Sequence, residues 1–214
     1  MDTSITILLH GLGRSRNIMN PIEKALIAEQ INVYNLSYPS TQHDIATLAK
    51  TIAERINKKF PEHTFNFVTH SLGSIVVRYM HAHNLLPRIH RVVMLAPPNH
   101  GTPVINFLCR FNWFAKFWGP AALQLATDDQ GIHHQLPDDV PFECGIIAGN
   151  KSIEPWFSWT LLKGENDGKV TVESTKLSGM KDHTLVNVAH PHFPKNPDVI
   201  EQVLYFLRHG CFRR

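Results

Sequence analysis

The chain has 214 residues, 43% of them apolar, which is enough to bury the core of one α/β domain and leaves little for a second. Lysine and arginine number 21 against 18 aspartate and glutamate residues, and the net charge of +3 is too small and too scattered for a nucleic-acid-binding face. We therefore expect one domain spanning residues 1–214 and no nucleic-acid partner.

The cysteines and the start of the chain favour a cytoplasmic protein. Cys109, Cys144 and Cys211 are odd in number and far apart, and no C-x-x-C pair is present, which favours a reduced compartment. Residues 1–4 lead directly into the apolar run 5–9, without the basic and longer apolar segments of a secretory leader. No stretch reaches the roughly 18 apolar residues expected of a membrane span.

Short apolar runs alternate with helical patterns through the first half of the chain. Residues 5–9 form a nearly continuous apolar run that ends in the glycine-containing loop 10–15, as expected for a parallel strand covered on both faces. Apolar residues then recur at helical spacing over 18–27, and residues 32–36 have the pattern of a second strand.

The alternation continues with the clearest helix of the chain. Its apolar face covers residues 44–60 and ends before Pro61. A third strand over 65–68 passes directly into a helix over 72–83, and a fourth strand follows at 91–95. Strands that alternate with helices of this length imply right-handed crossovers and a mostly parallel central sheet flanked by helices.

Regular patterning is lost between Pro97 and Pro141. A segment of this length without strand signals is usually functional, and we interpret residues 101–140 as a cap, or lid, over a site. The segment contains an aromatic cluster, comprising Phe107, Phe111, Trp113, Phe114, Phe117 and Trp118.

The last part of the chain returns to strand and helix patterns. Strand-like runs occur at residues 144–148, 161–162 and 184–188. The closing helix has Asn196 as its predicted N-cap, Pro197 at its first position and Gly210 as its stop.

Thr69-His70-Ser71-Leu72-Gly73 lies where the third strand passes into its helix. A G-x-S-x-G nucleophile elbow needs this context, because a tight turn must raise the serine hydroxyl above the sheet edge. Gly73 fits the pattern, whereas Thr69 replaces the first glycine. The alternative is that Ser71 only caps the following helix, so the other parts of a serine hydrolase must decide.

A serine nucleophile needs a histidine base and an acid that orients the base. In the α/β-hydrolase order the acid and then the histidine follow the serine. Asp167 lies in a polar, glycine-containing loop, and His190 directly follows the last predicted strand. Both residues fall where that order requires them. Other residues compete for the two roles, namely Glu165 and Asp182 for the acid and His192 for the base.

The backbone N–H groups of Leu12 and Leu72 are the candidate oxyanion hole, because one donor follows the nucleophile and the other lies after the first strand. The Gly11-Leu12-Gly13 loop does not predict a dinucleotide site, since Arg16 occupies the third glycine position of G-x-G-x-x-G. We expect no cofactor.

Three histidine pairs suggest a metal at first sight, namely His81/His83, His133/His134 and His190/His192. None has the spacing and the cysteine or carboxylate partners of a zinc site, and we expect no metal.

Together these motifs resemble the lipase-like and esterase-like branch of the α/β-hydrolase superfamily over nearly the whole chain. His10-Gly11-Leu12-Gly13 resembles its oxyanion loop, residues 69–73 its elbow, and residues 95–102 the segment after the next strand. Asp167-Gly168-Lys169-Val170 resembles its acid loop, and His190 with the closing helix its histidine end. The sequence departs from the pattern at Thr69 and at Ser74, where a second glycine often follows Gly73.

The resemblance implies a compact α/β-hydrolase fold and hydrolysis of carboxylic esters through an acyl-enzyme, without a cofactor. Because large apolar side chains suit an acyl chain or a lipid surface, we expect a hydrophobic acyl ester or lipid as substrate and transient contact of the cap with a membrane surface. The candidate substrate-binding residues are Phe107, Phe111, Trp113, Phe114 and Phe117. Short-chain esters, thioesters and acyl transfer remain open, as does a non-catalytic relative that binds a lipid or a protein.

Overall fold

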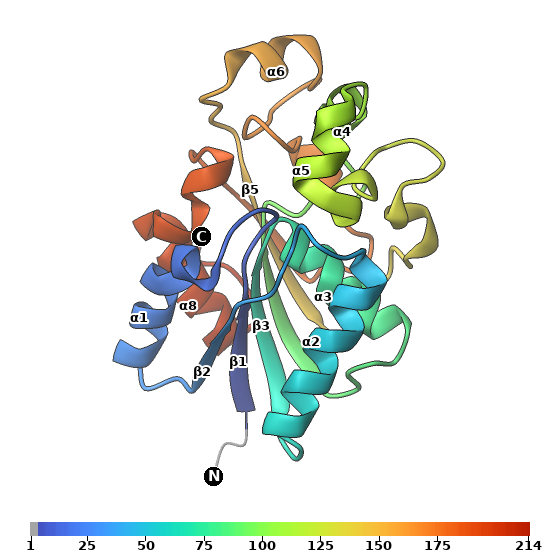
Figure 1. The fold of residues 1–214 in the computed structure, drawn as a ribbon. Helices are drawn as coiled ribbons and strands as arrows, with labels where there is room; N and C mark the ends of the chain where they lie inside the picture. Colours follow the sequence, from blue (N-terminus) through green and yellow to red (C-terminus); the bar gives the residue numbers. More distant parts are fainter. Residues whose placement is uncertain (1–3) are drawn as a thin grey trace.

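The computed structural model describes residues 4–214, except for the side chains of Asn112 and Pro155. Residues 1–3, which belong to the start of the chain where no secretory-leader pattern was found, lie outside the described residues. Within residues 4–214, six strands form one sheet in the order β2-β1-β3-β4-β5-β6, and each neighbouring pair is parallel (Figure 1). The strands are β1 Ser4–Leu9, β2 Val33–Leu36, β3 Thr64–His70, β4 Ile89–Leu95, β5 Glu143–Gly149 and β6 Asp182–Val186.

Helices cover both faces of this sheet (Figure 1). Because side chains alternate along a strand, Ile7 of β1 packs with α2 and α3 on one face, and its neighbour Leu8 packs with α1 and α8 on the other. Both residues are fully buried, which explains why the strands read as continuous apolar runs. The covering helices are α1 Asn20–Ala28, α2 Ile45–Lys59, α3 Leu72–Ala82 and α8 Pro197–His209.

The ends of the long helices follow local side-chain chemistry. Asp44 caps α2 by accepting a hydrogen bond from the Thr47 N–H at 2.8 Å. Hydrogen bonding from Thr47 lowers the pKa of the Asp44 carboxyl. Asn196 caps α8 in the same way, and Gly210 ends that helix at a φ of +69°. The predicted cap and stop of the closing helix are confirmed.

The strand predicted at residues 161–162 is wrong. These residues follow the short helix α6, Pro155–Thr160, and their N–H groups both donate to the Phe157 carbonyl, at 3.0 and 3.1 Å. Leu162 is buried, so it supplies an apolar anchor for a loop. A short apolar run has no clear period of its own, which is why the pattern suggested a strand. The last strand also lies earlier than predicted, at Asp182–Val186.

Residues 101–140 fold mainly into α4 Pro103–Leu108, α5 Asn112–Leu123 and the 3-10 helix η2 Ile132–Gln135. Helices α4, α5 and α6, which we call the roof, lie beyond the carboxyl ends of the strands (Figure 1). The remaining short elements are η1 Arg16–Met19, α7 Val172–Thr175 and η3 His190–Lys195. Among the helices of residues 4–214, none is both long and apolar enough to cross a bilayer.

Candidate active site

Ser71 occupies a sharp turn between β3 and α3. Its backbone has a φ of +52° and a ψ of −118°, a region that non-glycine residues rarely adopt, and its N–H donates to the Leu95 carbonyl at 2.9 Å. Strain of this kind costs on the order of 1 to 3 kcal/mol and persists only where the surrounding structure enforces it. The turn therefore has the geometry of a nucleophile elbow.

The two departures from the elbow pattern contact each other. The hydroxyl groups of Thr69 and Ser74, both buried, are 2.8 Å apart and share a hydrogen bond across the turn. Gly73 has a different role, because a Cβ at that position would lie 2.8 Å from the Leu9 carbonyl oxygen of β1. Threonine and serine are thus accommodated as a pair, while the glycine is required by close packing.

His190 lies between Ser71 and Asp167, at the start of η3. Its Nε2 is 3.1 Å from the Ser71 Oγ, and its Nδ1 is 2.6 Å from the Asp167 Oδ2. A carboxylate only accepts hydrogen bonds, so Nδ1 carries the proton and Nε2 is free to accept from the serine hydroxyl. Asp167 is 1% exposed, so this contact is shielded from water.

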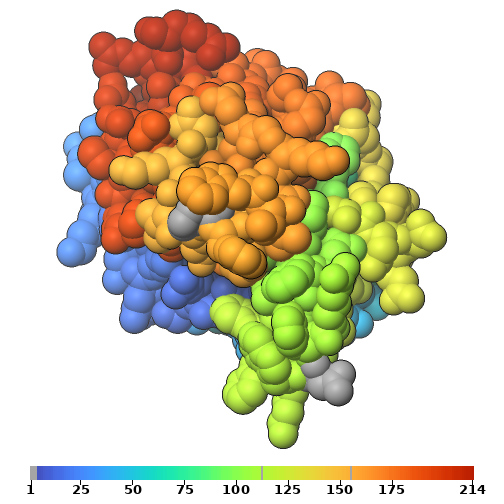
Figure 2. Space-filling view, turned by 90° about the horizontal axis from the view of Figure 1, so that it is seen from above, coloured from blue at the N-terminus to red at the C-terminus, as the bar shows by residue number. Residues whose placement is uncertain are grey.

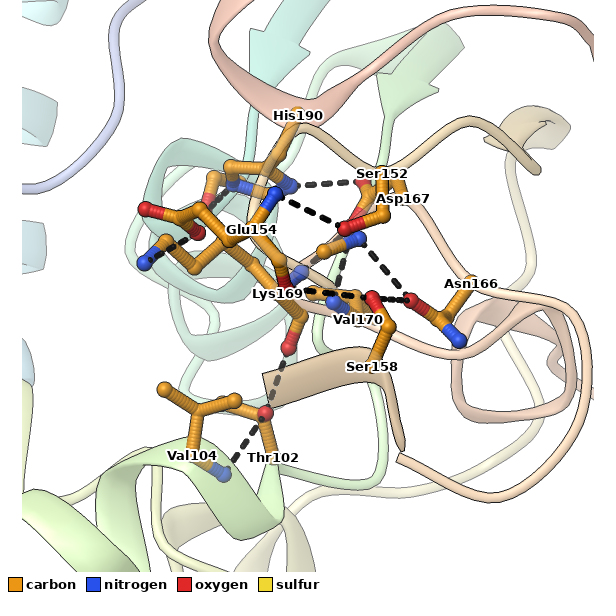
Figure 3. A network of polar contacts seen from close by, with 12 residues as sticks. Thr102, Val104, Ser152, Glu154, Ser158, Asn166, Asp167, Lys169, Val170 and His190 are labelled. Atoms are coloured by element: carbon orange, nitrogen blue, oxygen red, sulfur yellow. Dashed lines mark hydrogen bonds and ion pairs between the residues drawn. The ribbon is translucent and has the colours of Figure 1, made fainter. Parts of the chain in front are cut away.

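The Asp167 carboxylate is held by its own loop. Its Oδ1 accepts hydrogen bonds from the backbone N–H groups of Lys169 and Val170, at 2.9 and 2.8 Å (Figure 3). The backbone carbonyl oxygen of Asp167 accepts a hydrogen bond from the backbone N–H of His190 at 3.0 Å. The acid and the histidine are therefore joined through both side chain and backbone.

The competing residues face other partners. Glu165 accepts a hydrogen bond from the Asn150 side chain at 3.1 Å. Asp182 forms an ion pair with Arg214 at 2.6 Å, at the far end of β6. Of the two histidines in η3, His190 rather than His192 has ring nitrogens that face the serine and the acid.

The loop after β1 borders Ser71 and is fixed from below by a histidine. The His10 ring stacks on Tyr38 at a centroid distance of 4.2 Å and accepts a hydrogen bond from the Tyr38 N–H through Nε2. Its Nδ1 donates to the Gly11 carbonyl at 2.9 Å, and burial lowers its pKa, so the ring is neutral. Leu12 lines the cavity beside Ser71, and Leu72 is the first residue of α3, where an N–H has no acceptor within the helix.

A cavity of about 370 Å³ lies above Ser71 and His190. Its wall is largely apolar and comes mainly from the three helices of the roof and the residues that follow α5. The apolar side chains include Leu108, Trp113, Phe114, Trp118, Leu125 and Phe157. Seen from above, α6 (orange) and α4 with α5 (green) cover this end of the molecule (Figure 2).

Two of the five predicted substrate-binding residues, Trp113 and Phe114, line the cavity. Phe107, Phe111 and Phe117 do not line it. Phe107 packs against Phe111, with ring centroids 5.5 Å apart, and Phe117 is 70% exposed.

Sequence reasoning missed two aromatic residues of the wall, Trp118 and Phe157. Trp118 belonged to the aromatic cluster that suggested the cap. The aromatic residues of segment 156–159 were a second signal of the same kind, which the strand prediction at 161–162 obscured.

Helix α6 is fastened to the loop that carries Asp167. The Glu154 carboxylate pairs with the Lys169 ammonium at 2.6 Å, and that ammonium lies 4.7 Å from the centroid of the Phe157 ring. The Ser158 hydroxyl donates to the Asn166 Oδ1 at 2.8 Å (Figure 3). The acid loop therefore contacts both the reacting groups and the roof.

Across residues 4–214, no group of three or more His, Cys, Asp and Glu side chains is arranged to hold a metal ion.

Neither a protein-family model nor a curated protein sequence matches the chain. Solved structures do match. The mature form of the lipase BlEst2 from Bacillus licheniformis has a TM-score of 0.75 at 21% identity, over 96% of this chain and 91% of that one. This chain covers 50% of the propeptide form of the same lipase.

Two esterases show the same likeness. The metagenomic carboxyl esterase MGS0156 has a TM-score of 0.67 at 18% identity, over 89% of this chain and 65% of that one. A thermophilic esterase from Thermogutta terrifontis has a TM-score of 0.65 at 10% identity, over 96% of this chain and 90% of that one. The chain thus has the α/β-hydrolase fold, as its motifs predicted.

Proposed function

We propose that this chain is a serine hydrolase that cleaves carboxylic esters with hydrophobic acyl groups. The observation that carries the proposal is the continuous relay from the Ser71 Oγ through the His190 imidazole to the buried Asp167 carboxylate, at the floor of an apolar cavity. A serine that only caps a helix needs neither the second nor the third member of this relay.

In the proposed reaction, His190 Nε2 takes the Ser71 proton as Oγ attacks the acyl carbon, and the carbonyl oxygen becomes an oxyanion. The N–H groups of Leu12 and Leu72 bind that oxyanion; a donor of this kind contributes roughly 3 to 4 kcal/mol to lowering the barrier. The alcohol leaves with the proton from His190. Water then repeats the attack and releases the acid and free Ser71.

The wall of the cavity supports a hydrophobic acyl group as the substrate. Trp113, Phe114 and Phe157 place apolar surface around the space above Ser71, where an acyl chain can be removed from water. No step of this reaction requires a cofactor or a metal. We assign residues 1–214 to one domain and residues 101–140 to its cap, to which α6 adds a second part.

The outer surface of the roof supports brief contact with a lipid surface. Phe117 of α5 is 70% exposed, and Trp156 and Trp159 of α6 are 70% and 87% exposed. Aromatic side chains in such positions partition into the boundary between headgroups and acyl chains. Co-sedimentation with phosphatidylcholine vesicles tests this contact. If the contact exists, the double variant Trp156→Ala/Trp159→Ala should show a lower vesicle-bound fraction than the wild type.

Labelling with a fluorophosphonate probe tests the nucleophile. We expect the wild-type protein to be labelled, and Ser71→Ala to lose both the label and ester hydrolysis, with kcat lower by on the order of 10⁴- to 10⁶-fold. Folded wild-type protein that is neither labelled nor active would overturn the proposal.

A series of p-nitrophenyl esters from acetyl to decanoyl tests the acyl group. We expect kcat/KM to rise with chain length; a sharp preference for acetyl would contradict the hydrophobic assignment. Matched thioester substrates in the same series show whether oxygen esters are preferred.

A further inference from the structure

His70 connects the elbow to the loop of the proposed base. It is the last residue of β3 and precedes Ser71, and its Nε2 lies 3.0 Å from the carbonyl oxygen of His190. A carbonyl oxygen only accepts, so the Nε2 of His70 carries the proton and donates. The two imidazole rings have centroids 5.0 Å apart, and Phe193 packs near both of them.

The other nitrogen of His70 is costly to bury. Its Nδ1 is inaccessible and has no hydrogen-bond partner among the described residues, and a Cβ on Gly11 would lie 3.1 Å from it. Burial holds the pKa of His70 well below its usual value, so the ring stays neutral. An unpaired buried acceptor destabilises a fold, and an apolar side chain here would avoid that cost.

The single hydrogen bond that His70 donates joins two parts of the proposed relay. Residues 70 and 71 are adjacent in a strained turn, so the side chain of His70 moves with the Ser71 backbone. On the opposite side, Asp167 holds His190 through its ring Nδ1 and its backbone N–H. His70 holds the remaining polar group of the His190 backbone, its carbonyl.

We propose that His70 is a positioning residue: its Nε2–H fixes the His190 backbone relative to Ser71 and so sets the distance between the nucleophile and its base. This inference rests on the proposed function. It explains why an imidazole occupies a site where one of its nitrogens is left without a partner. A side chain that improves catalysis at the expense of stability is expected near a reacting centre.

The test compares His70→Phe, which removes the donor, with His70→Gln, which keeps an N–H donor. We expect His70→Phe to melt at or above the wild-type temperature, while kcat for a p-nitrophenyl ester and the rate of fluorophosphonate labelling both fall about 10-fold or more and KM stays within about twofold. His70→Gln should recover much of the lost rate. A phenylalanine at position 70 would be larger than histidine and would lie close to Gly11. His70→Leu therefore serves as a second variant that removes the donor with a smaller side chain.

His81→Phe is the matched control, because it changes a histidine on α3 whose ring packs against Phe142 and touches none of the reacting groups. We expect its kcat and labelling rate to equal those of the wild type. Wild-type rates in folded His70→Phe or His70→Leu would overturn the inference, as would a rate loss that His70→Gln does not relieve. Failure of the wild-type protein to react with the probe would instead overturn the proposed function.

Discussion

The carboxyl edge of the sheet and the roof above it differ in how their side chains are held. At the edge, Asp167 is 1% exposed and accepts two backbone hydrogen bonds in addition to its contact with His190. In the roof, Trp159 is 87% exposed and Phe117 is 70% exposed. Polar contacts fasten α6 to the chain below at two points, the Glu154 and Ser158 side chains.

This difference separates two tasks that an ester hydrolase must perform. Groups that transfer protons need fixed distances, and the closely packed sheet edge provides them. Groups that contact an acyl chain need apolar area more than exact placement, and the aromatic roof provides that area. Substitutions at the edge should therefore change kcat, and substitutions in the roof should change which substrates are bound.

Apart from Ser71→Ala, the largest effect is expected for Asp167→Asn. The amide can still accept the two backbone hydrogen bonds through its oxygen, so the protein should fold, but its NH₂ group would face His190 and favour the wrong tautomer. We expect kcat to fall by about 10⁴-fold. The control is Asp182→Asn, which changes the rejected acid and should leave kcat within about twofold; the reverse result would assign the acid to Asp182.

A smaller effect is expected in the roof, where α6 offers a matched pair. Phe157 lines the cavity, whereas its neighbour Trp156 is 70% exposed. Phe157→Ala should raise KM for a decanoyl ester about 10-fold and leave the acetyl ester nearly unchanged, because loss of apolar contact weakens binding of the longer chain most. Trp156→Ala should not alter KM for esters in free solution. Equal effects of the two substitutions would contradict the assignment of the wall.

The pair Thr69 and Ser74 tests whether the edge is held by coupled contacts. Thr69→Val leaves the buried Ser74 hydroxyl without this partner, and Ser74→Ala leaves the Thr69 hydroxyl with only a 3.5 Å contact to the Val93 carbonyl. Each substitution should lower the free energy of unfolding by about 1 to 3 kcal/mol. The double variant should lose less than the sum, with a coupling of about 1 kcal/mol in urea unfolding. Additive losses would show that the 2.8 Å contact contributes nothing.

The smallest effect is expected at the amino ends of the strands, where Glu143 begins β5. Hydrogen bonds from Lys181 and Arg91 lower the pKa of Glu143 to about 2. Because the folded-state pKa is depressed below its ordinary value of 4.5, the stabilisation is present above pH 4.5 and is lost as pH falls toward 2.

Glu143→Gln should therefore be less stable than the wild type at pH 7 and should approach the stability of the wild type as the pH falls from 4.5 toward 2, with kcat unchanged at pH 7. Urea unfolding at these pH values checks the prediction. A stability difference that grows as the pH falls would contradict it.

Much of the fold follows from local sequence. Apolar runs such as residues 5–9 are continuous because helices cover both faces of the sheet, and the caps at Asn196 and Gly210 depend only on neighbouring backbone. The strand at 161–162 was predicted wrongly because a run of two leucines carries no period. The helix α6 next to this run is held by a contact with a distant part of the chain, the hydrogen bond from Ser158 to Asn166, which local sequence does not specify.

The sequence by itself determined the order of elements and the loops on which Ser71, Asp167 and His190 lie, because strand alternation and chain order are local properties. Only the tertiary structure decided which side chains meet: the relay distances, the pairing of Thr69 with Ser74, the contribution of Phe157 to the cavity and the contact of His70 with His190. These depend on turns and crossovers that bring distant residues within hydrogen-bonding or van der Waals distance. No pattern along the chain specifies those distances.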